Sequence, residues 1–302
     1  MNLSKMNERF SADGAIVFQA GPGGLPMAVI TADGGQARVV LHGAHVTHYQ
    51  PSGQRPVLWM SAKSWFEAGR PIRGGVPICF PWFSQSSHVP NAPGHGIVRL
   101  RQWEVESAGR LGDGRVQLVL QTQSNGSAEP MWQWDYSLKF AVTVGPTLAM
   151  TLTAANTDTR PQTITEALHT YFAVSDVRNV KVRGLEDVAY VETAGGTHQP
   201  TGPQGGPITF AGEVDRGYFG TGAAVEIEDP GLGRRILIEK SGSRSTVVWN
   251  PWTAKAERMP DFGDDEWPEM LCVETANAGP DAVVLQPGQS HAMEARISVR
   301  AK

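Results

Sequence analysis

Short stretches of alternating apolar and polar residues recur along this chain, with turn-forming residues between them. The clearest is 136–144, where apolar side chains occupy nearly every second position, and such alternation predicts a strand with one buried face. Residues 147–153 can pair with it across Gly145-Pro146 as a β-hairpin. Further strands are predicted at 37–41, 116–121, 180–182, 224–227, 235–239, 245–249, 270–274 and 291–299.

Helical periodicity is scarce. One or two helical turns are predicted at 61–68, and another short one at 266–270. Closely spaced strands without alternating helices argue against a doubly wound parallel sheet and favour an all-β fold, a large antiparallel β-sandwich or barrel. Such folds often form one domain of about 200–250 residues. No change in composition requires a second domain, so we expect a single domain over 1–302, with its core at about 15–300.

Composition narrows the class of protein further. The 34 glycines and 21 prolines among 302 residues fit many turns rather than long helices. A net charge of −4 gives no reason to expect nucleic acid or an anionic membrane as partner. Neither a signal peptide nor a run of about 18 apolar residues is recognisable. We therefore expect a globular cytoplasmic protein.

The two cysteines, Cys79 and Cys272, are too few for a disulfide framework or a four-cysteine zinc site. Both lie in apolar runs, which indicates buried thiols in a reducing compartment.

The triplet His42, His45 and His48 invites a metal interpretation, but on a strand His45 points away from the other two. Structural or solvent-facing histidines are the simpler interpretation.

Two arginine-containing segments could bind an anion. Arg73 precedes Gly74-Gly75, where the backbone can bend close to a ligand and turn its amides toward it. In 94–103, Arg99 and Arg101 would share one face of a strand. For each segment a solvated arginine is the simpler alternative. The chain has no nucleotide P-loop motif.

His169 and Glu274 are titratable residues with strongly apolar neighbours. A desolvated carboxyl beside an imidazole suits general acid–base catalysis. Spacing alone does not show that the two residues meet, and a buried histidine with satisfied hydrogen bonds is the simpler interpretation.

The acidic stretch 257–269 lacks the spacing of a calcium loop and is interpreted as a solvated surface loop.

Taken together, six segments resemble the aldose 1-epimerase superfamily, and in particular its hexose-6-phosphate mutarotase branch. They occur in the family's order within about 40–300: Pro71-Ile72-Arg73-Gly74-Gly75-Val76-Pro77, His95-Gly96 followed by Arg99, Leu168-His169-Thr170-Tyr171-Phe172, Glu213-Val214-Asp215-Arg216, Val248-Trp249-Asn250-Pro251-Trp252 and Cys272-Val273-Glu274. The resemblance implies the galactose mutarotase-like type of β-sandwich and interconversion of the α and β anomers of a hexose 6-phosphate.

The resemblance also implies a role for each matching residue. His169 and Glu274 would be the catalytic pair, and Arg73 and Arg99 would contact the sugar phosphate. Asp215 would bind sugar hydroxyls, and His95 would lie beside the pocket. Gly94 and Arg101 depart from the family pattern at the phosphate end. A sugar phosphate is the expected partner of a monomer, and neither a metal nor a cofactor is expected.

Other functions remain open at this point. The same fold could serve as a non-catalytic carbohydrate-binding module, or as an aldose 1-epimerase acting on free sugars. A glycoside hydrolase would need a second carboxylate beside Glu274, for which Asp215 is the candidate. A cupin-like metal enzyme would depend on the histidine triplet.

Overall fold

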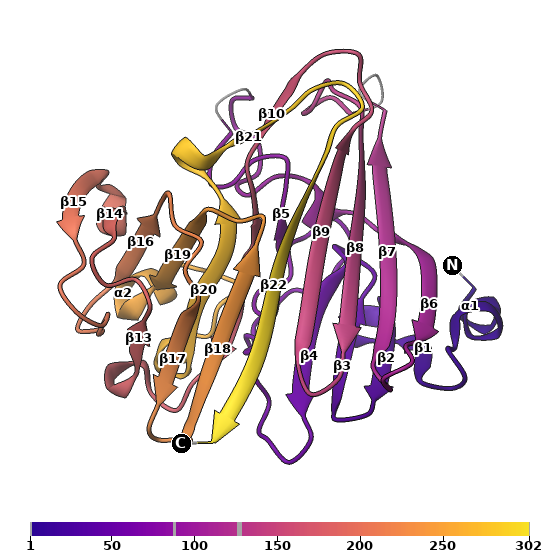
Figure 1. The fold of residues 1–302 in the computed structure, drawn as a ribbon, viewed down its shortest axis with the longest axis horizontal. Helices are drawn as coiled ribbons and strands as arrows, with labels where there is room; N and C mark the ends of the chain where they lie inside the picture. The colour runs from indigo at the N-terminus through magenta and orange to yellow at the C-terminus, as the bar shows by residue number, and fades with distance from the viewer. Residues whose placement is uncertain (1, 87–88, 126–128, 302) are drawn as a thin grey trace.

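The chain folds into two large antiparallel sheets with a smaller sheet at its N-terminal end (Figure 1). The computed structural model describes residues 2–86, 89–125 and 129–301. Within these residues, α-helix is confined to α1 (Leu3–Phe10) and α2 (Trp252–Ala256). The prediction of an all-β fold, a large antiparallel β-sandwich with few short helices, is confirmed.

One eight-stranded sheet, called the long sheet here, contains the longest strands and has the order β13-β17-β18-β22-β9-β8-β7-β6. The predicted hairpin forms its centre, with Tyr136 opposite Asn156 and Val144 opposite Leu148. In this order, the strands are Lys181–Arg183, Val225–Asp229, Arg234–Ser241, Ser290–Ala301, Leu148–Asn156, Tyr136–Val144, Val116–Ser124 and Glu104–Arg110.

The other eight-stranded sheet, called the site sheet here, has the order β15-β14-β16-β19-β20-β11-β5, and β12 also pairs with β20. All residues of β19 and β20 are buried, which explains why these strands read as nearly continuous apolar runs. The strands are, in that order, Gln199–Pro203, Ala189–Glu192, Val214–Tyr218, Ser245–Asn250, Met270–Asn277, Glu166–Leu168, Ile78–Cys79 and, for β12, Tyr171–Ala173.

The remaining elements lie around these two sheets. The N-terminal sheet comprises β1 to β4: Ile16–Ala20, Pro26–Ala32, Gly35–Val40 and His45–Pro51. A two-stranded sheet joins β10 (Gln162–Ile164) to β21 (Val283–Leu285). The 3₁₀ turns of the described residues are Pro22–Gly24, Val98–Leu100, Val177–Asn179, Ala194–Gly196, Trp267–Glu269 and Gly279–Asp281.

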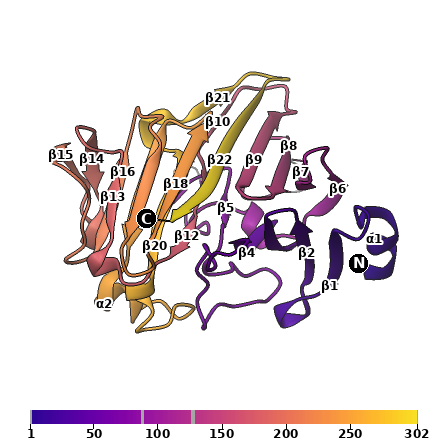
Figure 2. The same cartoon turned by 60° about the horizontal axis from the view of Figure 1, so that its bottom comes forward.

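The main hydrophobic core is continuous through both large sheets. Figure 2 shows β18 and β22 of the long sheet lying over β20 of the site sheet. Leu138, Phe140 and Val142 alternate along β8 and are fully buried, and each such side chain contributes about 1.5–3 kcal/mol of transfer free energy. Residues of β20 belong to this core, and Glu274 on the same strand lines a cavity.

Two local predictions are wrong, and one is confirmed. Residues 61–68 form turns, because the hydroxyl of Ser61 accepts from the Lys63 and Gly263 amides and that of Ser64 accepts from the Arg73 amide, contacts that compete with helix. The short helical turn predicted at 266–270 is confirmed as the 3₁₀ turn Trp267–Glu269, which leads into β20. The segment around Arg99 is a 3₁₀ turn rather than a strand.

No helix in the described part of the chain has the length and apolarity needed to cross a bilayer.

Candidate active site

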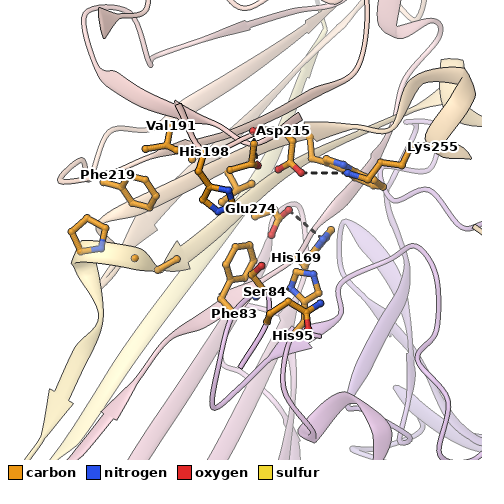
Figure 3. Close-up of a pocket in the computed structure, with 18 of the residues that line it drawn as sticks. Phe83, Ser84, His95, His169, Val191, His198, Asp215, Phe219, Lys255 and Glu274 are labelled. Carbon is orange, nitrogen blue, oxygen red and sulfur yellow. Dashed lines mark hydrogen bonds and ion pairs between the residues drawn. The ribbon is translucent and has the colours of Figure 1, made fainter. Parts of the chain in front are cut away.

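His169 and Glu274 face one another across two strands of the site sheet. Leu168 pairs with Thr275 and Tyr171 with Cys272, so the register places His169 opposite Glu274. The distance from His169 Nε2 to Glu274 Oε1 is 3.3 Å, and the two side chains are 9% and 1% exposed. The two residues that the sequence nominated separately therefore meet (Figure 3).

The backbone around His169 is held by the segment that follows Arg73. The His169 amide donates to the Pro77 carbonyl at 3.0 Å, and the Tyr171 amide donates to the Gly75 carbonyl at 2.9 Å. These bonds replace strand pairing at the point where β11 ends and β12 begins. The imidazole stacks on the Tyr171 ring, with centroids 4.8 Å apart, which fixes its plane.

Gly74 and Gly75 serve close packing between segments of the protein. Both have positive φ, and a Cβ on Gly75 would lie 2.3 Å from the Val46 carbonyl oxygen. The Gly75 amide donates to the Trp59 carbonyl at 2.7 Å, so it is not available to an anion. The Gly75 amide therefore takes no part in a backbone anion cradle, and the glycines allow the Arg73 loop to lie against β4.

A cavity of about 900 Å³ opens beside the catalytic candidates. All six residues nominated from the sequence line it: Arg73, His95, Arg99, His169, Asp215 and Glu274. Apolar side chains, among them Trp249 and Phe219, cover much of the remaining wall. The volume lies within the range of about 300–1,000 Å³ that is usual for small-molecule sites.

Burial pushes both catalytic candidates toward their uncharged forms. The pKa of the His169 imidazole is lowered to about 3, first by burial and then by the positive charges of Arg99 and Arg73. The pKa of the Glu274 carboxyl is raised well above its usual range by burial and by the Asp215 carboxylate. Both shifts favour a state in which the proton of the pair lies on Glu274 and the imidazole of His169 is neutral, so the pair offers one acid and one base.

Arg73 reaches the cavity with its charge already compensated. Its Nε and Nη2 donate to the two carboxylate oxygens of Asp261, each at 3.2 Å, and its Nη1 donates to the Tyr171 hydroxyl at 2.9 Å. Burial alone would lower the pKa of Arg73, but its contacts with Tyr171 and Asp261 outweigh that effect and raise it. Asp261 thus positions the arginine.

Asp261 corrects the interpretation of 257–269 as a solvated loop. Its side chain is 4% exposed, whereas Asp264 in the same stretch fits that interpretation, because it is exposed and pairs with Lys63 at the surface. The signal that sequence reasoning missed is Phe262, the aromatic residue after Asp261, which is fully buried.

Arg99 reaches the cavity with its charge uncompensated. Its Nη2 donates to the Gly94 carbonyl at 2.7 Å, and its buried Nε has no hydrogen-bond partner. Among the described residues no carboxylate forms an ion pair with it. Burial lowers the pKa of its guanidinium.

Arg101 pairs with Glu129 and does not line the cavity. Arg99 and Arg101 therefore do not share a face as predicted.

His95 lies beside His169, with ring centroids 5.3 Å apart (Figure 3). The Ser84 amide donates to its Nδ1 at 3.3 Å, and burial together with the charge of Arg99 keeps the pKa of His95 well below its usual value. The neutral ring therefore carries its proton on Nε2. His95 has φ 62°, a conformation that costs a residue with a side chain about 1–2 kcal/mol and that tertiary contacts must impose.

Asp215 is paired with a residue that sequence reasoning missed. Lys255 on α2 lies 3.4 Å from the Asp215 carboxylate and 2.9 Å from that of Glu213. Burial raises the pKa of Asp215, while Lys255 and Thr193 act in the opposite direction. No pattern in the sequence marks Lys255, because only the turn between β19 and α2 brings this residue to Asp215.

Two members of the histidine triplet support the arginine loop. His42 Nε2 lies 2.8 Å from the Arg70 carbonyl, and His45 Nε2 lies 2.7 Å from the Gly74 carbonyl. Both histidines therefore have a structural role.

Cys79 and Cys272 are buried and free, as the sequence predicts.

Solved structures share this architecture. A galactose mutarotase-like protein from Clostridium acetobutylicum superposes with a TM-score of 0.71 at 14% identity, over 95% of this chain and 98% of that one. A Salmonella typhimurium protein described as "a putative mutarotase (YeaD)" superposes with a TM-score of 0.88 at 29% identity, over 96% of this chain and 95% of that one. The fold is therefore the galactose mutarotase-like β-sandwich.

Sequence comparison defines the family. The profile of the family described as Aldose 1-epimerase matches residues 26–298. A protein from Cenchrus ciliaris named "Putative glucose-6-phosphate 1-epimerase" is 34% identical over 84% of this chain and 78% of its own length. A protein of the same name from Escherichia coli (strain K12) is 33% identical over 88% of each chain. This chain belongs to the aldose 1-epimerase family, and its enzyme class is that of an isomerase.

Proposed function

We propose that this chain interconverts the α and β anomers of a hexose 6-phosphate, with glucose 6-phosphate as the expected substrate. The observation that carries the proposal is one cavity that contains both the His169–Glu274 pair, at 3.3 Å, and the uncompensated guanidinium of Arg99. The names of the relatives point to the same sugar phosphate. A phosphate at the Arg99 end and hydroxyls at the Asp215 end would orient the sugar.

Anomer interconversion requires the hemiacetal ring to open and close. A proton leaves the hydroxyl on C1 while another reaches the ring oxygen; the C1–C2 bond then rotates, and the ring closes on the other face. In this scheme Glu274 takes the proton from O1, and His169, as imidazolium, protonates the ring oxygen. Reclosure returns both protons, so the pair ends as it began. Each such group typically contributes about 10²–10⁴-fold.

The protonation of the pair fits this scheme. Moving the single shared proton from Glu274 to His169 creates the carboxylate and the imidazolium that ring opening needs, with no change in net charge. His95 can donate from Nε2 to a sugar oxygen nearby, since its Nδ1 already accepts from Ser84. Arg73 and Arg99 would bind the phosphate, which is remote from C1 and supplies orientation.

The contacts of Glu274 favour an epimerase over a glycoside hydrolase. Its carboxylate is paired with His169, and the other candidate carboxylate, Asp215, pairs with Lys255. A hydrolase would instead require two carboxylates on either side of the scissile bond.

The cellular context is part of the proposal. We propose a monomer, because all six residues assigned to catalysis and substrate binding line one cavity of a single chain. A phosphorylated sugar does not cross a membrane unaided, which favours the cytoplasm.

Saturation-transfer NMR on purified protein tests the proposal directly. We expect fast exchange between the anomeric signals of glucose 6-phosphate and slower exchange for free glucose at the same concentration. Equal exchange for both sugars would favour a free-sugar epimerase, and binding of glucose 6-phosphate without exchange would favour a non-catalytic carbohydrate-binding protein. Either result contradicts the proposal.

A further inference from the structure

Cys272 lies next to the catalytic pair, and the proposed reaction does not use it. It is two residues before Glu274 on β20, so both side chains lie on the same face of the sheet. A thiol sulfur from Cys272, a carboxylate oxygen from Glu274 and a ring nitrogen from His169 all lie within 4.8 Å of one another. All three residues are buried.

We infer that His169, Cys272 and Glu274 form a binding site for a thiophilic divalent ion such as Zn²⁺, and that the bound ion inhibits the enzyme. In a tetrahedral zinc site, with bonds of about 2.0–2.3 Å, neighbouring ligand atoms lie about 3.3–3.6 Å apart. The 3.3 Å between His169 Nε2 and Glu274 Oε1 already matches this separation. The sulfur lies within 4.8 Å of a ring nitrogen of His169 and of a carboxylate oxygen of Glu274, so a rearrangement on the order of 1 Å brings the three ligand atoms to the tetrahedral separation.

The surroundings leave room for the ion and give it a route of entry. His169 and Glu274 line the cavity, so an ion can reach the cluster through the cavity. Glu274 Oε2 is buried without a hydrogen-bond partner, and a bound ion would satisfy this carboxylate. Three protein ligands leave the fourth position to water on the cavity side.

The mixed set of ligands selects the kind of ion. Sulfur, nitrogen and oxygen donors suit Zn²⁺, Co²⁺ and related ions, whereas Mg²⁺ and Ca²⁺ prefer oxygen ligands alone. Binding requires the thiol to become a thiolate, so its proton leaves for the solvent, as does the proton shared by His169 and Glu274.

The ion and the sugar phosphate would exclude one another. An ion bound between His169 and Glu274 occupies the lone pairs that must accept and pass on protons, and it occupies the space beside C1. The inhibition rests on the proposed function. Binding of the ion does not, so the two can be tested separately.

Cobalt titration of the metal-free protein is the test of binding. With wild-type protein we expect one equivalent of Co²⁺ to produce a thiolate-to-cobalt charge-transfer band in the near ultraviolet, and excess glucose 6-phosphate to remove it. Cys272→Ser and Cys272→Ala should lose the band and bind Co²⁺ more than about 10-fold more weakly, since loss of even an outer contact to a metal ligand costs about that much. Near-ultraviolet circular dichroism confirms that each variant is folded.

Cys79→Ser is the matched control, because Cys79 is also buried but lies outside the cluster. It should keep both the band and the affinity. A wild-type protein without the band, a band that survives in both Cys272 variants, or a band that depends on Cys79 would overturn the site.

Inhibition by Zn²⁺ is measured on anomer exchange, with each variant compared with its own metal-free rate. The concentration of Zn²⁺ that halves the rate should rise more than about 10-fold in Cys272→Ala and stay unchanged in Cys79→Ser. If cobalt binds as expected but the metal-free enzyme exchanges no anomers, the proposed function fails and the metal site stands. Equal inhibition of all variants would overturn inhibition through this site.

Discussion

Arg73 and Asp261 are 188 positions apart and form a two-pronged ion pair at the edge of the cavity. Both carboxylate oxygens are used, and the Tyr171 hydroxyl accepts a third hydrogen bond from the guanidinium. The arginine is therefore fixed before any ligand arrives, and its charge is largely balanced. Arg99, by contrast, has no such partner among the described residues, so the net positive charge at this end of the cavity belongs to Arg99.

Replacing Asp261 should destabilise the protein because it leaves the guanidinium of Arg73 without its counterion. We expect Asp261→Asn to lower the free energy of unfolding by about 1–3 kcal/mol, as measured by urea denaturation. Asp264→Asn is the control from the same acidic stretch. Its surface ion pair with Lys63 should change stability by less than about 1 kcal/mol, and equal effects of the two substitutions would contradict the role of Asp261.

Arg99 should determine the preference for phosphorylated sugar. We expect Arg99→Met to reduce kcat/KM for glucose 6-phosphate by about 10- to 100-fold, which is the loss of one charge-assisted contact, with little effect on free glucose. Arg101→Met, two residues away, should leave both sugars unaffected because Arg101 pairs with Glu129 outside the cavity. Equal losses for the two sugars would mean that Arg99 has a structural role.

The catalytic pair should be separable from binding. Glu274→Gln and His169→Ala should each slow anomer exchange by about 10²–10⁴-fold, because each removes one of the two proton-transfer groups. Calorimetric titration with glucose 6-phosphate should show a dissociation constant close to that of the wild type. Near-normal exchange by either variant would reject the assignment of that residue.

The overall fold and the strand positions could be predicted from local pattern, but the partners of the arginines could not. Alternation in 136–144 is a property of adjacent residues, and β8 forms there. The contact between Arg73 and Asp261 depends on how distant loops meet, which no local pattern records. Resemblance to a family nominated Arg99, which lines the cavity, whereas the strand considered for its segment is a 3₁₀ turn.

Lys255 illustrates the same limit within the site. Its position on α2 follows from a turn at the end of β19, and Asp215 lies on β16, the strand that pairs with β19. Only the register of that pair brings the two charges together. One family segment contains Asp215, another ends at Trp252, and none includes Lys255, so nothing in the sequence pointed to the lysine.

We expect Lys255 to keep Asp215 ionised. Without the lysine, burial would raise the pKa of Asp215 further and weaken its ability to accept hydrogen bonds from sugar hydroxyls. Lys255→Met should therefore increase KM about 3- to 10-fold, with a smaller effect on kcat, and the defect should lessen as pH rises. Lys255→Arg should restore KM. A defect that does not change with pH would indicate that the lysine only supports the packing of α2.

Glu166 should make the stability of the protein depend on pH. This fully buried residue on β11 accepts from Asn277 Nδ2 at 3.0 Å and lies 3.3 Å from His291 Nε2, while its Oε2 has no partner. Burial raises the pKa of its carboxyl from 4.5 to about 7, against a smaller opposing contribution from Asn277. The folded state therefore binds a proton that the unfolded state releases, and the stabilisation present below pH 4.5 is lost as pH rises through 7.

Glu166→Gln removes this titration and keeps an oxygen that can accept from Asn277. The free energy of unfolding of the variant minus that of the wild type should rise between about pH 4.5 and 7 and then level off. A shift of about 2.5 pKa units corresponds to a total rise of about 3 kcal/mol. The opposite effect of His169, whose lowered pKa costs stability as pH falls below 6.5, is common to both proteins and cancels in the difference. Urea denaturation at each pH measures the difference, and a constant value across this range would show that folding does not raise the pKa of Glu166.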